Sequence, residues 1–147
     1  MSDDLVVTID KFAFRIAPDR WYTREGVWAQ PEAAGVRVGL SDFLQQRSGD
    51  IAFAEVPPIG TSVAAGDEIA SIETIKVNVA LDSPVSGQVI EVNPALDTAP
   101  EAINQDPYGA GWLAVIATSD WEADRSRLLD AVAYREVVQR VAAEEIT

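Results

Sequence analysis

The distribution of turn-forming residues divides the chain into two unlike parts. No other feature of the sequence limits the possible folds as much. Glycine and proline recur at short intervals over residues 21–111, whereas residues 122–144 contain neither. Short apolar runs between such turns favour strands. In the uninterrupted segment Tyr134, Val138 and Val141 recur at helical spacing, which predicts an amphipathic helix or two. The sequence therefore predicts a mainly β domain followed by C-terminal helices.

The expected boundaries follow these patterns. Residues 1–20 are expected to form an extended arm or an extra edge strand, residues 21–120 the β domain, and residues 121–147 helices packed on it. A serine and an aspartate can cap a short helix over residues 42–46, and residues 94–111 are rich in proline and glycine and are expected to be a loop. The strands are predicted at residues 36–40, 51–56, 68–75, 77–81, 88–92 and 112–117.

The residue inventory excludes several kinds of chemistry. The 147 residues include no cysteine and no histidine. Without cysteine there is no disulfide, thiolate metal site or cysteine nucleophile, and without histidine the usual general base and commonest transition-metal ligand are missing. We therefore expect no catalytic residue and no metal site, and a protein that is not an enzyme.

The charge of the chain also limits its partners. A formal net charge of −13 would be repelled by nucleic acid and by an anionic membrane surface, so neither is expected as a partner. The acidic start lacks the positively charged region of a signal peptide, and no apolar stretch is long enough to span a membrane. We expect a cytoplasmic protein.

Lysine is rare, which draws attention to each one. Two of the 11 basic residues are lysines, Lys11 and Lys76, and the others are arginines. Lys76 lies where two predicted strands meet, so it is expected at the turn of a hairpin. One interpretation is an ordinary lysine on the solvent side of a strand. The other is a scaffold that displays this amine, which suits a turn-rich β domain without histidine or cysteine.

Several short motifs follow one another in a fixed order along residues 21–138. They are Tyr22-Thr23-x-Glu25-x-x-Trp28, Val38-Gly39-Leu40-Ser41-Asp42, Gly49-Asp50-Ile51, Glu73-Thr74-Ile75-Lys76, Ser83-Pro84-Val85-Ser86-Gly87 and Ile103-Asn104-x-Asp106-Pro107-Tyr108-Gly109-x-Gly111-Trp112. Together they resemble the H protein of the glycine cleavage system and its relatives, which are lipoyl carriers. The last motif is the most specific of the set.

The resemblance implies a lipoyl-domain-like flattened barrel or sandwich of two small sheets (a barrel-sandwich hybrid) with C-terminal helices. It also implies lipoate in amide linkage to Lys76, within a Glu-Ser-x-Lys pattern in which Glu73 and Thr74 occupy the first two positions. Biotin carriers have methionines beside their lysine, whereas Ile75 and Val77 stand here, so lipoate is the expected cofactor. The implied partners are a lipoate ligase or lipoyl transferase and dihydrolipoamide dehydrogenase.

Nearby carboxylates allow two interpretations. Glu73, together with Asp67 and Glu68, is expected either to guide the lipoylating enzyme and other partners to the hairpin, or to be an ordinary solvated turn carboxylate.

Two positions depart from the glycine-cleavage pattern. The family has a glutamate before the tryptophan of the first motif and a histidine after the short helix, and both line the cleft that shelters the amine-bearing arm. Val27 and Arg47 stand at those positions. An aminomethyl ammonium group needs hydrogen-bond acceptors, and Arg47 would repel it.

These departures favour one branch of the family. We expect a lipoate-binding protein of the kind found in sulfur-oxidising bacteria, which carries a sulfur-containing intermediate for a heterodisulfide-reductase-like complex, with Arg47 near the arm. The alternative is an H protein that carries the aminomethyl group for the glycine cleavage enzymes. A third interpretation is an unlipoylated structural or regulatory subunit with Lys76 as a surface lysine.

Overall fold

The computed structural model describes residues 3–146, which form three antiparallel sheets. A separate hairpin consists of β1 (Leu5–Ile9) and β2 (Phe12–Ile16). The largest sheet contains, in spatial order, β3 (Trp21–Tyr22), β4 (Val27–Pro31), β5 (Val36–Leu40), β11 (Ala114–Thr118), β10 (Gly87–Val92) and β7 (Ser62–Val63). The remaining sheet contains β6 (Ile51–Glu55), β8 (Glu68–Thr74) and β9 (Asn78–Asp82).

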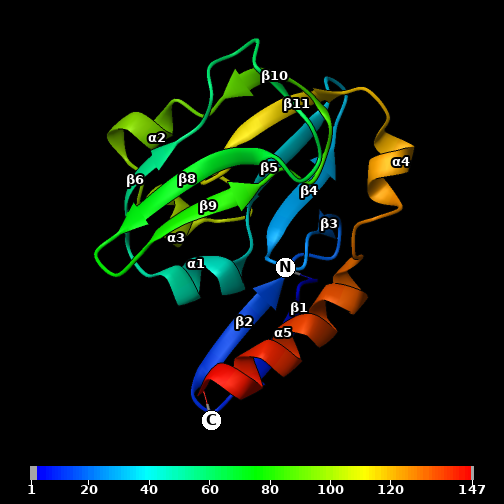
Figure 1. Ribbon diagram of the computed structural model, residues 1–147. Coiled ribbons are helices and arrows are strands. Elements are labelled where there is room, and N and C mark those ends of the chain that lie inside the picture. Colours follow the sequence, from blue (N-terminus) through cyan, green and yellow to red (C-terminus); the bar gives the residue numbers. More distant parts are fainter. Residues whose placement is uncertain (1–2, 147) are drawn as a thin grey trace.

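The two larger sheets stack face to face, as Figure 1 shows for β8 and β9 lying over β4 and β5. Ile69 and Ile72 of β8 are fully buried in one cluster with Val38 and Leu40 of β5. Burying each such side chain stabilises the fold by about 1.5–3 kcal/mol. The expected mainly β sandwich with C-terminal helices is confirmed, and within residues 3–146 the sheets remain separate layers rather than a closed barrel.

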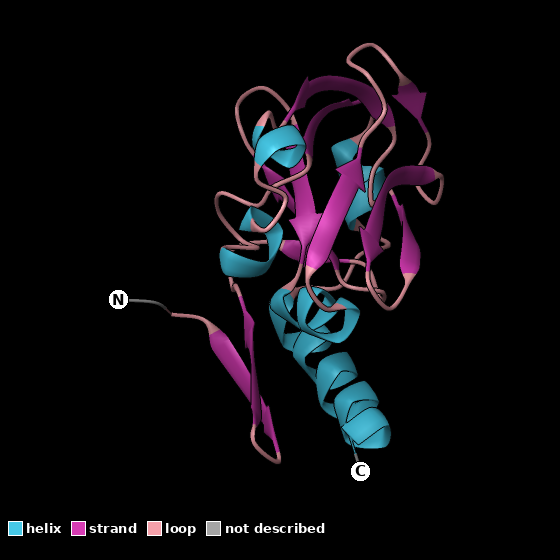
Figure 2. Cartoon of the chain, turned by 90° about the vertical axis from the view of Figure 1, so that its left-hand side faces the viewer, coloured by secondary structure: helices cyan, strands magenta, loops and turns pink. Residues whose placement is uncertain are grey.

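A second core lies between the N-terminal hairpin and the C-terminal helix. The helices are α1 (Asp42–Ser48), α2 (Ala95–Thr98), α3 (Ala102–Gln105), α4 (Trp121–Arg125) and α5 (Ala131–Ile146). Figure 2 shows the β1–β2 hairpin alongside α5, below the sandwich. Val7 and Phe14 of the hairpin are buried with Val138 and Ala142 of α5. The hairpin therefore covers the apolar side of this helix.

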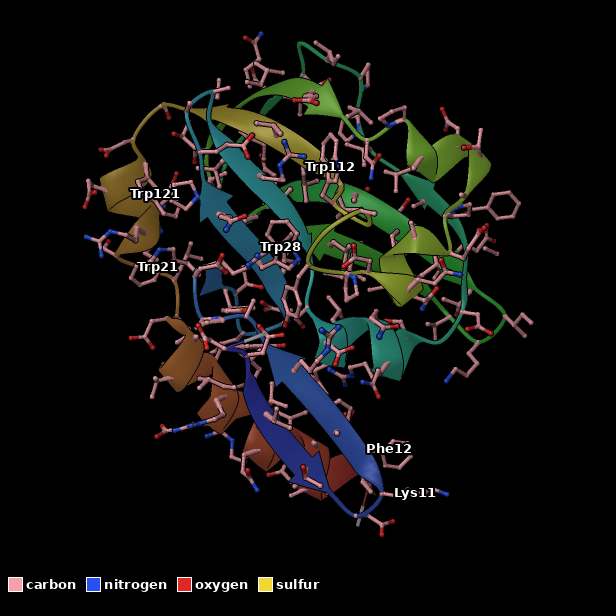
Figure 3. The ribbon with its side chains drawn as sticks, turned by 180° about the vertical axis from the view of Figure 1, so that it is seen from behind. Lys11, Phe12, Trp21, Trp28, Trp112 and Trp121 are labelled. Carbon is pink, nitrogen blue, oxygen red and sulfur yellow. The ribbon has the colours of Figure 1, made fainter. Side chains whose placement is uncertain are left out.

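Trp28 joins this second core to the sandwich. Its indole N–H donates to the carbonyl oxygens of Leu40 (2.9 Å) and Pro107 (3.0 Å). The ring lies so close to Gly39 that a Cβ there would be 2.5 Å from it, which explains the glycine. Figure 3 shows Trp28 at the centre of the molecule, and the side chain is fully buried.

Two segments differ from the expected secondary structure. Residues 5–16 form two paired strands instead of one, because Asp10 takes a left-handed conformation (φ 55°) that closes a two-residue turn between Ile9 and Phe12. The expected loop over residues 94–111 contains α2 and α3, four-residue helices too short to show a helical period. Residues 1, 2 and 147 of the expected arm and helices lie outside the described residues.

Candidate functional site

A tight turn joins β8 to β9 and is organised by one side chain. The Oγ1 of Thr74 accepts hydrogen bonds from the backbone N–H groups of Lys76 (3.2 Å) and Val77 (3.0 Å) and donates to the carbonyl of Val77 (3.2 Å). The backbone N–H of Thr74 donates to that same carbonyl at 2.9 Å. Since Thr74 is only 8% exposed, its hydroxyl fixes the turn from within.

This turn differs from the predicted strand pattern. The sequence predicts strands that run to Ile75 and resume at Val77, but β8 ends at Thr74 and β9 begins at Asn78. The side chain of Ile75 is consequently 97% exposed instead of lying on a strand face. A fixed backbone thus presents an apolar residue directly before Lys76.

Lys76 lies at the tip of the turn with an exposed side chain. Its stem passes over Gly49, where a Cβ would come within 2.9 Å of the lysine Cε. Together with Asp50, Thr74 and Ile75 these residues border a shallow hollow of about 350 Å³. The Lys76 ammonium takes part in none of the ion pairs found within residues 3–146. The amine is therefore available to a modifying enzyme.

The other lysine has different surroundings. Lys11 lies at the tip of the β1–β2 hairpin, where Figure 3 shows it beside Phe12. Its Nζ is 5.9 Å from the centre of the Phe12 ring, a cation–π distance. Lys11 and Lys76 therefore occupy the turns of two different hairpins.

A second hollow of about 480 Å³ lies beside the β8–β9 turn, between β9, α1 and the end of α5. Its lining is largely apolar, with one cation and three carboxylates on it. The lining residues are Glu25, Val27, Leu44, Arg47, Ser48, Val77, Val79, Ala80, Leu81, Asp82 and Glu145.

The sequence predicts Arg47 near the arm, where its charge would repel a bound cation. It does line this hollow, but its Nη2 forms an ion pair with Oε1 of Glu145 at 2.7 Å. Glu25 and Asp82 add two further carboxylates to the same lining. The hollow therefore has more negative than positive side chains, and these carboxylates offset the expected repulsion of a bound cation by Arg47.

The acidic residues expected to mark the hairpin are scattered. Glu73 is exposed and opens onto another groove, of about 590 Å³, which Phe53 and Asn78 also line. Asp67 and Glu68 lie at the opposite end of β8 from Lys76, about 20 Å away at the rise of a strand. The structure thus brings Thr74 to Lys76, leaves Glu73 on the neighbouring face, and separates the other two from the turn.

Sequence reasoning missed the three carboxylates of the second hollow. Glu145 meets Arg47 across 98 positions of sequence, so no local spacing could reveal the pair. Glu25 belongs to a recognised motif, but nothing in that motif shows that it shares a hollow with Asp82. Only the tertiary packing of α5 brings these groups together.

The side chains with a shifted pKa are three tyrosines of the second core and not residues of the two hollows. Loss of solvent on burial raises the pKa of the Tyr22, Tyr108 and Tyr134 hydroxyls above their ordinary value near 10. Each hydroxyl is hydrogen-bonded, as in the 2.7 Å contact between Tyr134 and Ser41. Within residues 3–146 no group of carboxylates could hold a metal ion, and no helix is long and apolar enough to cross a membrane.

A sandwich that presents an exposed lysine on a hydrogen-bonded turn is the arrangement expected of a carrier domain. The family model described as "Glycine cleavage H-protein" matches residues 20–141. The chain is 41% identical over 127 residues to the glycine cleavage system H protein of a Thermus thermophilus strain, covering 86% of this chain and 98% of that protein. The H protein of Anaeromyxobacter sp. strain K is 43% identical over 124 residues, covering 84% and 96%.

A solved structure gives the same result. The crystal structure of a glycine cleavage system H protein from Mycobacterium marinum superposes with a TM-score of 0.73 at 35% identity, covering 86% of this chain and 99% of the other. The chain belongs to the glycine cleavage H-protein family. Proteins of this family are carriers rather than catalysts and hold lipoate covalently on a lysine. An exposed lysine at a turn, held in no ion pair within the described residues, fits such a group.

Proposed function

We propose that Lys76 is the lipoyl attachment residue and that the protein carries the aminomethyl intermediate of the glycine cleavage system. The observation that carries this proposal is the turn itself, which offers the Lys76 amine on a backbone fixed by Thr74. Lys11, the other lysine, lies outside residues 20–141, the part matched by the family model. The names of the relatives support glycine cleavage as the pathway.

Amide formation with lipoate removes the positive charge of the lysine and gives a long flexible arm. The dithiolane supplies the thiol–disulfide chemistry that a chain without cysteine lacks. A tethered intermediate has a high effective concentration at any active site that the arm can reach. The protein's own task is then to hold the base of the arm and to be recognised.

The second hollow is the proposed resting place of the loaded arm. Val77 and Val79 line it from the turn and β9, so it adjoins Lys76. Its apolar residues suit the hydrocarbon part of the arm. With Arg47 paired, Glu25 and Asp82 are left to interact with an ammonium group at its end. This charge balance favours the aminomethyl cargo.

The proposed partners are a lipoate ligase or lipoyl transferase, the glycine cleavage enzymes and dihydrolipoamide dehydrogenase, acting in the cytoplasm. The modifying enzyme would meet Ile75 and Glu73 on either side of the buried Thr74. Both side chains are exposed, so both are open to contact by that enzyme.

Because the chain has two lysines, attachment can be tested with a matched pair of variants. The protein is co-expressed with a lipoate ligase and its intact mass is measured. We expect one lipoyl adduct in the wild type and in Lys11→Arg, and none in Lys76→Arg, which keeps the charge but removes the primary amine. An adduct that persists in Lys76→Arg, or none in the wild type, would contradict the proposal and would favour an unlipoylated subunit.

A second candidate is carriage of a sulfur-containing intermediate for a heterodisulfide-reductase-like complex. One feature favours it: the hollow is lined by Val27 and Arg47, at positions where the resemblance implies a glutamate and a histidine. Incubating the lipoylated protein with glycine decarboxylase and labelled glycine separates the two candidates. Efficient loading of the arm supports the glycine pathway, and failure to load a fully lipoylated protein supports the sulfur pathway.

A further inference from the structure

The ion pair at the rim of the second hollow involves a residue from outside the family region. Arg47 lies on α1, within the matched residues 20–141, whereas Glu145 lies beyond them, in the last turn of α5. Their side chains meet at 2.7 Å and both line the hollow. A carboxylate beyond the residues that the family model matches thus pairs with Arg47.

The position of Glu145 depends on a second segment outside the family region. The end of α5 is held by the β1–β2 hairpin, through Phe14 packed in one buried cluster with Ala142. Phe14 also makes an edge-to-face contact with Phe43 of α1, with ring centres 4.9 Å apart. Hairpin, α1 and α5 are consequently fixed to one another on the side of the hollow where Arg47 and Glu145 meet.

We propose that Glu145 is a specificity-determining residue for the cargo on the arm. By pairing with Arg47 it cancels the cation of the hollow and leaves the two carboxylates Glu25 and Asp82 unopposed. The hollow then takes up an arm that ends in a cation in preference to one that ends in a neutral or anionic group. This inference rests on the proposed function, because it requires a lipoyl arm on Lys76.

The ion pair contributes to charge selection far more than to folding. The side chains of Arg47 and Glu145 are 45% and 40% exposed, and pairs so open to water add little to stability. Replacing Glu145 with glutamine should therefore leave the fold intact while exposing the charge of Arg47 to the hollow. Glu144 provides the matched control, since it is an exposed neighbour that does not line the hollow.

The absence of cysteine permits a direct test. Reducing the lipoylated protein opens the dithiolane, and the two thiols of the arm are then the only thiols in the molecule. Each thiolate displaces halide from 2-bromoethylamine, iodoacetamide or iodoacetate, which forms a C–S bond and gives a cationic, neutral or anionic arm. Mass spectrometry verifies complete alkylation. Methyl NMR signals of Val27, Val79 and Leu81, which line the hollow, then report the fraction of docked arm.

In the wild type and in Glu144→Gln we expect the cationic arm to dock more strongly than the neutral and anionic arms. In Glu145→Gln the preference for the cationic arm should fall about two- to fivefold, the range typical of a partly exposed charge pair. The double variant Arg47→Gln/Glu145→Gln should recover the preference, because it removes the unpaired cation as well.

Two results would overturn the inference. One is an equal preference in the wild type and Glu145→Gln, and the other is a loss in Glu145→Gln that the double variant does not restore. Absence of the lipoyl adduct would instead refute the proposed function, and the mass spectrum detects that before any arm is alkylated. Failure of one proposal is therefore distinguishable from failure of the other.

Discussion

At the scale of single residues, Thr74 does the most for the site. In a turn without such bonds the backbone of the lysine would be mobile. Here one buried hydroxyl oxygen accepts hydrogen bonds from the backbone N–H groups of Lys76 and Val77. The family's pattern has serine at this position, which offers the same hydroxyl. The chemistry needed is thus a short side chain with an oxygen at Cβ, rather than threonine as such.

Replacing Thr74 with valine tests this role, since valine keeps the shape and removes the oxygen. We expect the free energy of unfolding to fall by about 1 kcal/mol, because the N–H groups of Lys76 and Val77 lose their acceptor and water only partly replaces it. Thr74→Ser keeps the hydroxyl and loses only a methyl group, so it should cost less than Thr74→Val. Urea unfolding measures both, and equal losses in the two variants would contradict the assignment.

At the scale of elements, the β1–β2 hairpin and α5 form one unit. Neither could bury its apolar side alone, because a two-stranded hairpin is marginal in water and α5 needs a surface to cover. Val7 and Phe14 supply that surface, and Val138 and Ala142 complete it. The unit meets α1 through Phe43, which ties it to the helix that carries Arg47.

A pair of substitutions on β2 measures how strongly this unit is held. Phe14 is 3% exposed and Phe12, on the same strand, is 39% exposed. Phe14→Ala should lower the free energy of unfolding by about 3–5 kcal/mol through the cavity it leaves. Phe12→Ala should cost about 1 kcal/mol or less. Chemical denaturation gives both values, and similar costs at the two positions would show that the hairpin does not pack as described.

The same elements show what the sequence could and could not predict. Strands around Lys76 were predictable because apolar runs and turn residues lie next to each other in the chain. The hairpin turn at Asp10 has a local signal, an aspartate able to adopt a left-handed conformation, yet the flanking runs are short enough to resemble a single extended arm. The pairing of Glu145 with Arg47 has no local signal, since it depends on where α5 ends in space.

At the scale of the whole molecule, three tyrosines link the second core to the sandwich. Tyr22 and Tyr134 stack with ring centres 4.4 Å apart, and Tyr108 donates to the carbonyl of Arg15 on β2 at 2.8 Å. Burial raises the pKa of all three hydroxyls in the folded state. The folded protein therefore keeps protons that the unfolded chain releases near pH 10.

The stability of the protein should consequently depend on pH in the alkaline range. A raised pKa in the folded state contributes stability that is fully present below the unfolded value of 10 and is lost as the pH rises above it. We expect tyrosinate absorbance to appear together with the loss of circular dichroism, in one cooperative step above about pH 10. Ionisation of the tyrosines near pH 10 with the spectrum of the fold unchanged would contradict their burial.

The β8–β9 turn projects at one edge of the sandwich, as Figure 1 shows, and Lys76 lies there over Gly49, between α1 and β6. Two enzymes that both need the proposed attachment residue cannot bind to the β8–β9 turn at the same time. Handover among them must therefore be serial, with each enzyme letting go before the next engages. For such a shuttle, the speed of release from each complex limits throughput more than the tightness of binding, so weak and short-lived encounters serve it best.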